Sequence, residues 1–336
     1  MYFTTMNTFR EIMEWPDMKN WMRFLFLEET LDFFQKKYEN EPLRAAAFLQ
    51  KTSWGDDLRG VSDQLVDTAN LVLDIQNGKR RCLHLRDWRD WKPKATDEPT
   101  NPDCSFIIVP VVKDKEVKKP AAVICPGGAY LCVSFQNEGT PIQIRMEDKG
   151  YRCFMLNYRI AQNAEYPNAQ MDLLEAVAYV RDNADEYGID TDKVVTVGFS
   201  AGGHLVASAA GLAEELLPKG KPNAVVAGYP VITLKKEDTH KESAENVTGF
   251  NDELREKLSV EEIVNETYPP AFAWACEDDD CVPCVNTTYY EKALEKYGIE
   301  HETHLYPTGG HGCGLAFGNS AQGWSGEMFD FLKRVL

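Results

Sequence analysis

Short apolar segments alternate with amphipathic segments from Ser105 to the C-terminus, and this alternation limits the possible folds more than any other feature of the chain. The expected strands are Phe106–Val111, Ala121–Ile124, Arg152–Leu156, Val194–Gly198, Ala224–Ala227, Ala271–Trp274 and Glu302–Tyr306. The expected helices are Thr140–Lys149, Ala169–Tyr187, Ala201–Leu216, Val285–Tyr297 and Gln322–Leu336. Strands joined by helices of roughly 10 to 20 residues pair in parallel and carry helices on both faces of the sheet. The sequence therefore predicts a mostly parallel, doubly wound α/β domain.

The N-terminal part of the chain follows a different pattern. Apolar residues between Met22 and Phe34 recur nearer every 3.6 residues than every two, which predicts helices over residues 1 to about 80. Residues 78–102 then combine basic residues with tryptophans and prolines. Basic residues interleaved with aromatic ones can stack on nucleic acid, but Asp87 and Asp90 interrupt this run, so a partly packed connector is expected. The chain is thus expected to consist of an N-terminal helical extension over 1–100 and an α/β domain over 101–336.

The charge and the cysteine content narrow the functional classes. The 336-residue chain has 36 Lys and Arg against 53 Asp and Glu, a formal charge of −17, which disfavours binding to nucleic acid or to an anionic membrane and favours neutral or cationic substrates. Its apolar runs are far shorter than the roughly 18 to 20 residues of a membrane-spanning helix, and no secretory signal is visible. Nine cysteines, an odd number in a chain without a leader, indicate reduced thiols. A cytoplasmic protein is expected.

The segment Gly198–Gly203 is the strongest chemical signal. It has the pattern Gly-x-Ser-x-Gly after an expected strand and before an alanine-rich helix, where small residues allow a tight turn that exposes a serine hydroxyl. Ser200 is therefore the candidate nucleophile. The alternative is a glycine-rich helix start that only packs closely against the sheet.

A nucleophilic serine needs a base and an orienting acid. His311 lies in a glycine-rich loop after the last expected strand, whereas His204 follows Ser200 by one helical turn and is expected to pack or cap there. The acid is expected within residues 277–280, which are four consecutive carboxylates. The glycine loop after the strand Ala121–Ile124 supplies candidate oxyanion donors, and by position these are the amides of Gly128, Ala129 and Ala201.

Together these motifs resemble the bacterial esterase/lipase family of α/β-hydrolases, which includes acetyl-xylan-esterase-like enzymes. The resemblance covers about two-thirds of the chain, and further matching segments are Asn137–Gly139, Asn157–Arg159, Tyr166–Pro167, Ser259–Val264 and Pro269–Pro270. It implies that 101–336 is an α/β-hydrolase catalytic domain and that Asp279, three residues before the valine of a Val-Pro pair, is the acid. It also implies hydrolysis of carboxylic esters with short acyl groups, often acetyl on sugars. Cys125–Pro126 departs from the family pattern, which often has histidine before the glycines.

The function expected on these grounds is a serine esterase that acts on a small-molecule or oligosaccharide ester. An amidase, arylformamidase or peptidase could use the same three residues, and a non-catalytic ligand receptor is a further alternative. This serine chemistry requires no cofactor. No metal is expected either, because a second cysteine pair would be needed beside Cys281 and Cys284 to bind zinc. A redox role of these two cysteines, or of Cys276 and Cys313, is left open.

Residues 1–100 also hold more large aromatic side chains than a monomer can expose to water. They are Trp15, Trp21, Phe24, Phe26, Phe33, Phe34, Tyr38, Trp54, Trp88 and Trp91. Because the segment is short and no flexible linker follows it, we expect it to pack on the catalytic domain as a lid, or on a partner subunit in a homo-oligomer.

Overall fold

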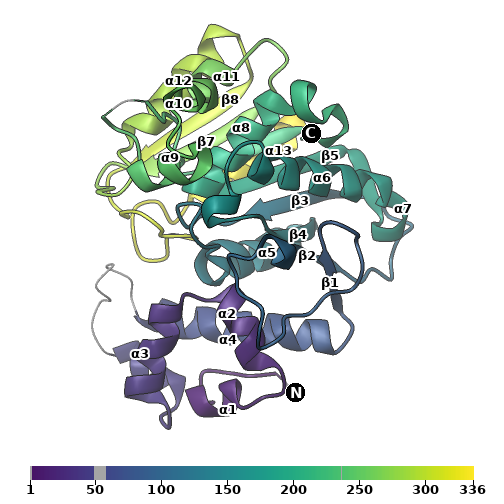
Figure 1. The fold of residues 1–336 in the computed structure, drawn as a ribbon, viewed down its shortest axis with the longest axis vertical. Helices are drawn as coiled ribbons and strands as arrows, with labels where there is room; N and C mark the ends of the chain where they lie inside the picture. Colours follow the sequence, from purple (N-terminus) through teal and green to yellow (C-terminus); the bar gives the residue numbers. More distant parts are fainter. Residues whose placement is uncertain (1, 49–57, 236) are drawn as a thin grey trace.

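An eight-stranded β-sheet forms the centre of the protein (Figure 1). The structure is a computed structural model that describes residues 2–48, 58–235 and 237–336, and the counts below refer to these residues. The strands are β1 (Arg80–His84), β2 (Phe106–Pro110), β3 (Lys119–Cys125), β4 (Arg152–Asn157), β5 (Ile189–Phe199), β6 (Ala224–Gly228), β7 (Ala271–Cys276) and β8 (His301–Tyr306). Their order is β1-β2-β4-β3-β5-β6-β7-β8. Strand β2 is antiparallel to β1 and to β4, and all other neighbouring pairs are parallel, which confirms the mostly parallel sheet.

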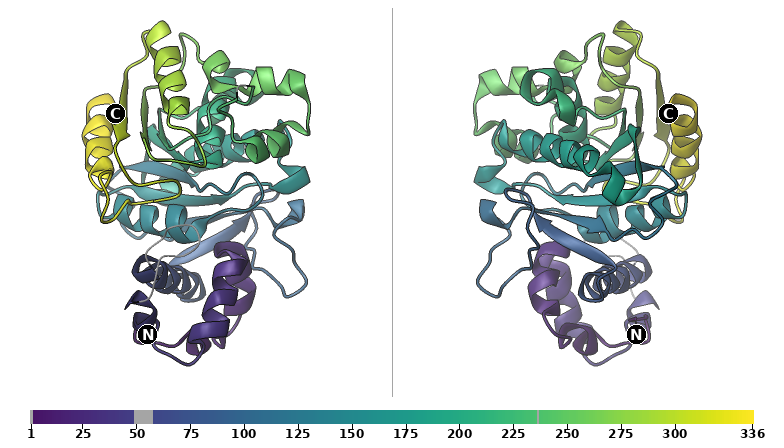
Figure 2. Two further views of the ribbon diagram at one scale, coloured as in Figure 1. Left: turned by 90° about the vertical axis from the view of Figure 1, so that its left-hand side faces the viewer. Right: turned by 90° about the vertical axis from the view of Figure 1, so that its right-hand side faces the viewer.

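Helices cover both faces of this sheet. They are α1 (Phe9–Met13), α2 (Met18–Leu25), α3 (Glu28–Tyr38), α4 (Leu58–Gln76), α5 (Thr140–Glu147), α6 (Asn168–Asp182), α7 (Ala184–Tyr187), α8 (Ala201–Leu216), α9 (Lys241–Thr248), α10 (Asp252–Leu258), α11 (Val260–Ile263), α12 (Val285–Lys296) and α13 (Trp324–Val335). Short helical turns are η1 (Leu43–Phe48), η2 (Pro102–Cys104), η3 (Phe135–Gly139), η4 (Ala161–Asn163) and η5 (Pro218–Gly220), of which η3 is a π-helix. Helices α6, α8, α11 and α12 lie on one face, and α5 and α13 lie on the other (Figure 2). None of the described helices is both long and apolar enough to cross a lipid bilayer.

The pattern from Ser105 onward was predicted well. All seven expected strands are present, and strands β2 to β7 are recognisable because strands covered on both faces are largely apolar, whereas β8 is mostly polar. The helix expected over Ala169–Tyr187 is divided at Asn183 into α6 and α7, and the other four expected helices are present. Helices α9 to α11, between β6 and β7, were not predicted.

The N-terminal helices α1 to α4 lie beside the β1 edge of the sheet (Figures 1 and 2). Strand β1 comes from residues 78–102, which were expected to form a partly packed connector, so the sheet begins earlier in the chain than expected. No apolar run marks this strand, because Arg80, Arg81 and His84 make up most of it. Trp54, one of the aromatic residues expected to be buried, lies outside the described residues.

Aromatic side chains join the N-terminal helices to the sheet. The ring of Phe106, on β2, stacks on Trp91 at a centroid distance of 5.0 Å and on Phe135, which begins η3, at 6.0 Å. From α2, Trp21 and Phe24 contact Phe106 edge-on at 6.2 and 6.1 Å. Trp91 is partly buried and the other four rings are buried, so part of the aromatic surface of the N-terminal segment packs on the sheet.

Replacing Trp21 with alanine is expected to lower the free energy of unfolding by about 3 to 5 kcal/mol, the usual range for a buried aromatic side chain. Trp21 is 2% exposed and contacts β2, so the N-terminal helices and the sheet should still unfold in one transition. Urea titration followed by far-UV circular dichroism and by tryptophan fluorescence measures both properties. The matched control is Trp15→Ala at a position that is 38% exposed, which should lose about 1 kcal/mol or less. Equal losses in the two variants would contradict the packing described for Trp21.

Candidate active site

Ser200 lies at the turn from β5 into α8 in a strained backbone conformation. Its φ is 53° and its ψ is −120°, a region that residues with a Cβ atom rarely adopt. Backbone hydrogen bonds hold it there. The Ser200 amide donates to the Gly228 carbonyl at 3.0 Å, and the Ser200 carbonyl accepts from the amides of Val231 at 3.2 Å and His204 at 3.1 Å. The hydroxyl is thereby presented at the carboxyl edge of the sheet.

Two glycines make this turn sterically possible. A Cβ atom on Gly198 would lie 2.1 Å from the Gly202 carbonyl oxygen, and one on Gly202 would lie 2.1 Å from the Cys125 carbonyl oxygen. Both distances are far below van der Waals contact, so neither position tolerates a side chain without a backbone shift. The Gly-x-Ser-x-Gly pattern thus predicted this turn for the correct physical reason.

Ser200, His311 and Asp279 form a continuous chain of hydrogen bonds. Ser200 Oγ lies 2.8 Å from His311 Nε2, and His311 Nδ1 lies 2.8 Å from Asp279 Oδ2. Because a carboxylate accepts and does not donate, the imidazole proton lies on Nδ1, and Nε2 accepts from the serine hydroxyl. Asp279 Oδ1 accepts from the amides of Cys281 at 3.0 Å and Val282 at 2.9 Å, which orients the carboxylate. Three residues predicted from separate segments thus come together.

Among the four consecutive carboxylates, Asp279 hydrogen bonds to His311. The Asp279 side chain is fully buried, whereas Asp278 and Asp280 are exposed. Asp278 Oδ1 instead accepts from the amides of Gly309 at 2.9 Å and Gly310 at 2.8 Å, so it holds the loop that leads to His311.

The glycine loop after β3 lies against Ser200. A Cβ atom on Gly127 would lie 2.8 Å from Ser200 Cβ, and one on Gly128 would lie 2.4 Å from the Cys132 carbonyl oxygen. Gly128 and Ala129 both have positive φ, of 126° and 56°. This part of the loop therefore approaches the serine with backbone rather than with side chains.

Carbonyl groups of this loop are held by backbone donors. The Gly127 carbonyl accepts from the Ser134 amide at 3.0 Å, and the Gly128 carbonyl accepts from the Leu131 amide at 2.7 Å. In a trans peptide the N–H group points opposite to the carbonyl group. The amides of Gly128 and Ala129 therefore point away from these donors.

Ala201 is the third residue predicted to supply an amide. It is the first residue of α8 and follows Ser200 directly. The first amides of a helix have no acceptor within the helix, and the helix dipole places partial positive charge there. The partial positive charge at this end of α8 would therefore stabilise an anion next to Ser200.

His204 is buried on α8, in agreement with its expected packing role. Its Nδ1 lies 2.7 Å from the Tyr130 hydroxyl, and its Nε2 lies 2.9 Å from the Leu258 carbonyl oxygen. Burial lowers the pKa of His204 to about 4, so the ring is neutral near pH 7, accepting from Tyr130 and donating to Leu258. The imidazole thus ties the glycine loop to the helices inserted between β6 and β7.

Two residues of that insertion were not predicted to lie near the site. Asn246 Nδ2 donates to the Ala129 carbonyl at 2.9 Å. His240 precedes α9, and its Nδ1 lies 2.8 Å from Ser243 Oγ. The pKa of His240 is lowered by burial and then by the neighbouring His311. No glycine pattern or apolar run marks either residue in the sequence, so local signals could not place them here.

The cysteines near the site carry no disulfide, since all nine are free thiols. Cys276 is buried and hydrogen bonds to Cys313, whose pKa it raises. Cys281 is exposed and Cys284 is partly buried. Within the described part of the chain, no three His, Cys, Asp or Glu side chains are grouped as metal ligands would be.

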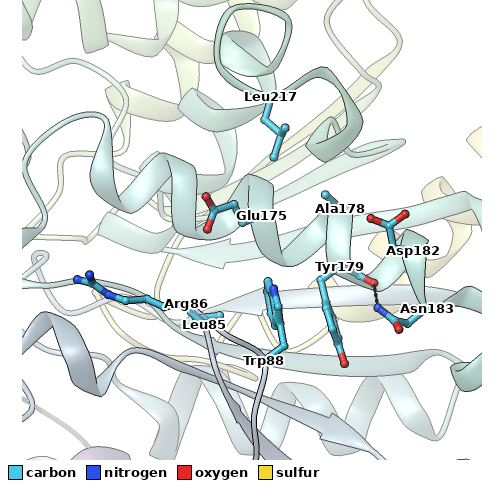
Figure 3. Close-up of a pocket in the computed structure, with 9 residues that line it drawn as sticks. All are labelled: Leu85, Arg86, Trp88, Glu175, Ala178, Tyr179, Asp182, Asn183 and Leu217. Atoms are coloured by element: carbon cyan, nitrogen blue, oxygen red, sulfur yellow. Dashed lines mark hydrogen bonds between the residues drawn. The ribbon is translucent and has the colours of Figure 1, made fainter.

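A separate hollow of about 500 Å³ lies between the turn after β1 and helix α6 (Figure 3). Trp88 and Tyr179 stack there with ring centroids 4.1 Å apart. Its lining residues are Leu85, Arg86, Trp88, Glu175, Ala178, Tyr179, Asp182, Asn183 and Leu217. None of the three hydrogen-bonded residues lines it, so this hollow is distinct from the site around Ser200.

The buried His204 predicts a pH dependence of stability. A histidine in the unfolded chain has a pKa of about 6.5, so between pH 6.5 and 4 the unfolded state binds a proton that the folded state does not. The free energy of unfolding should fall by up to about 3 kcal/mol as pH decreases through this window. His204→Gln keeps a donor for Leu258 but does not titrate, so its stability should fall less steeply. Urea unfolding from pH 4.5 to 7.5 tests this, and identical slopes would contradict it.

Comparison with known proteins identifies the family. The BD-FAE family model matches residues 107–294, which include Ser200 and Asp279 and end before His311. The chain is 31% identical over 246 residues to endo-1,4-β-xylanase B of Butyrivibrio fibrisolvens, covering 68% of this chain and 38% of that protein. It is 32% identical over 202 residues to an acetylxylan esterase of Xylanibacter ruminicola, covering 58% of this chain and 41% of that protein. The chain spans less than half the length of these two curated relatives.

Solved structures agree with this assignment. An acetyl ester-xyloside bifunctional hydrolase from Caldicellulosiruptor lactoaceticus is 29% identical, with a TM-score of 0.66 over 76% of this chain and 96% of that chain. The carboxylesterase Cest-2923 from Lactobacillus plantarum is 27% identical, with a TM-score of 0.61 over 68% of this chain and 92% of that chain. Because the family model matches more than half of the chain, the protein belongs to the BD-FAE family and has the α/β-hydrolase fold.

Proposed function

We propose that this protein hydrolyses carboxylic esters through Ser200, with His311 as the base and Asp279 as the orienting acid. The observation that carries the proposal is the unbroken hydrogen-bonded chain from Asp279 to the Ser200 hydroxyl. A serine hydroxyl is a weak nucleophile alone, and an adjacent imidazole whose tautomer is set by a carboxylate activates it.

In the proposed mechanism, Ser200 Oγ attacks the ester carbonyl carbon while His311 Nε2 takes the hydroxyl proton. The tetrahedral intermediate collapses, the alcohol leaves with the proton from His311, and the acyl group stays on Ser200. Water then attacks the acyl carbon while His311 takes a proton from it, and the second tetrahedral intermediate collapses. The bond to Ser200 Oγ breaks, His311 returns the proton to Oγ, and the carboxylic acid is released. Asp279 stays ionised and stabilises the imidazolium ion in both steps.

The negative oxygen of each tetrahedral intermediate is proposed to bind the amides of Gly128, Ala129 and Ala201. The contact between the glycine loop and Ser200 supports this assignment, as do the engaged carbonyls of Gly127 and Gly128. Preorganised amides of this kind usually contribute about 100- to 1000-fold to the rate per donor.

The substrate is proposed to be a neutral alcohol, such as a carbohydrate, that carries a short acyl group, with acetyl preferred. An acetylxylan esterase and an acetyl ester-xyloside hydrolase are among the similar proteins, which supports this class. The formal charge of −17 also favours a neutral substrate over an anionic one.

A panel of ester substrates tests this function. We expect acetyl esters to be hydrolysed faster than butyryl esters and octanoyl esters barely at all, and acetylated xylo-oligosaccharides to release acetate. Ser200→Ala should remove the activity without changing the thermal unfolding midpoint by more than a few degrees. N-formylkynurenine and a peptide amide in the same panel test the arylformamidase and peptidase alternatives. Preferred cleavage of either, or substantial activity in Ser200→Ala, would contradict the proposal.

Substitutions in the acidic loop test the role of Asp279. Asp279→Asn keeps an acceptor for the amides of Cys281 and Val282 but places an NH₂ group against His311 Nδ1, so kcat should fall by about 10⁴-fold. Asp278→Asn keeps the oxygen that accepts from the glycine loop, and should lose less than about tenfold. The exposed Asp280→Asn is the control. Steady-state kinetics on an acetyl ester rank the three variants by their loss of kcat. A larger loss in Asp278→Asn than in Asp279→Asn would contradict the role proposed for Asp279.

A further inference from the structure

Glu138 is a buried carboxylate that hydrogen bonds to a backbone amide of the glycine loop and to a tyrosine hydroxyl beside the His311 loop. It lies on the π-helix η3 and is 3% exposed. Its Oε2 accepts from the Gly127 amide at 2.6 Å, and its Oε1 accepts from the Tyr229 hydroxyl at 2.7 Å. Both bonds are short, and both donors are neutral groups.

At the first contact, Glu138 orients the glycine loop. The peptide between Pro126 and Gly127 is held at both ends, because the Tyr158 hydroxyl donates to the Pro126 carbonyl at 2.7 Å while the Gly127 amide donates to Glu138. This peptide immediately precedes the one that carries the Gly128 amide. Glu138 therefore restrains the backbone directly before the proposed oxyanion donors.

At the second contact, Glu138 reaches the histidine loop through Tyr229. The Tyr229 hydroxyl donates to Glu138 and accepts from the Gly314 amide at 3.0 Å. Its ring also meets the His311 ring edge-on, at a centroid distance of 4.9 Å. Burial raises the pKa of Tyr229 well above its ordinary value, so the hydroxyl keeps the proton that it donates. The neighbouring Asn137 adds a parallel link, since its Nδ2 donates to the Gly312 carbonyl at 2.8 Å.

We infer that Glu138 is a positioning residue that fixes the glycine loop and the His311 loop in one geometry relative to Ser200. This inference rests on the proposed function, because the geometry matters only if Ser200 transfers acyl groups. The carboxylate does not touch the reacting atoms. It acts through Gly127 on the oxyanion side and through Tyr229 and Gly314 on the side of the base.

A carboxylate suits this position better than an amide. Gly127 and Tyr229 both present hydrogen-bond donors, and a carboxylate offers an acceptor oxygen to each. Glutamine has nearly the same shape but one acceptor oxygen, so its NH₂ group would face a donor. Glu138→Gln therefore removes one of the two links without creating a cavity.

The experiment compares Glu138→Gln and Tyr229→Phe with a matched control. The control is Asp172→Asn, another buried carboxylate, which pairs with Arg159 at 2.7 Å and has no assigned part in the reaction. Two rates are measured: kcat and KM on an acetyl ester, and the rate constant for labelling of Ser200 by a fluorophosphonate. The labelling reaction needs the activated serine and the oxyanion donors but no carboxylic ester.

We expect Glu138→Gln to lower kcat and the labelling rate by about 10- to 100-fold with little change in KM, and Tyr229→Phe to lower both by about tenfold. The double variant should lose less than the product of the single losses, because both residues act through one network. Asp172→Asn should lower the thermal unfolding midpoint while kcat stays within about threefold of wild type.

Three results would overturn the inference. They are a Glu138→Gln protein with wild-type kcat and labelling rate, losses that Asp172→Asn reproduces, and fully multiplicative losses in the double variant. If wild type is labelled at Ser200 but hydrolyses no ester, the proposed function fails while the labelling rates still decide the role of Glu138. If wild type is neither labelled nor active, both are overturned. Should Glu138→Gln fail to fold, Tyr229→Phe decides the question through the same two rates.

Discussion

Close backbone packing at the turn from β5 into α8 is the constraint on which the site depends. A Cβ atom on Gly202 would lie 2.1 Å from the Cys125 carbonyl oxygen, so α8 can begin against the end of β3 only because this residue is glycine. The same approach places Gly127 in contact with Ser200. A longer distance between α8 and β3 would separate the serine hydroxyl from the glycine loop, and no side-chain adjustment could restore the arrangement.

The register of the parallel strands brings the glycine, acidic and histidine loops to the carboxyl edge of the sheet, where Ser200 lies. Cys125 pairs with Gly198, so the glycine loop and the serine turn leave the sheet at one level. Cys276 pairs with Tyr306 in the same way, so the acidic loop and the histidine loop leave together. Parallel strands place successive loops at their carboxyl ends, which is why residues more than 180 positions apart in the sequence can form one site.

A feature could be predicted from the sequence where its signal is carried by residues that are close together in the chain. Glycines beside Ser200 and His311 predicted the turn and the loop on which the structure places them. Asp279 was not distinguishable from Asp278 by charge or spacing alone, and the family resemblance selected it. Glu138 and Tyr229 were not predicted to act together, because 91 residues separate them and nothing near Glu138 distinguishes a buried carboxylate from an exposed one. Strand β1 was missed for a similar reason, since its pairing with β2, and not its composition, makes it a strand.

The position of η3 connects the N-terminal helices to the residues around Ser200. This π-helix begins at Phe135, whose buried ring stacks on Phe106 in the aromatic cluster that also includes Trp21, and it carries Glu138 three residues later. Helix α4 packs against both η3 and α5. Rings from the N-terminal segment therefore fill space behind the backbone that holds the Glu138 carboxylate. If Glu138 positions the glycine loop as proposed, the N-terminal helices support that loop from within the protein through this packing.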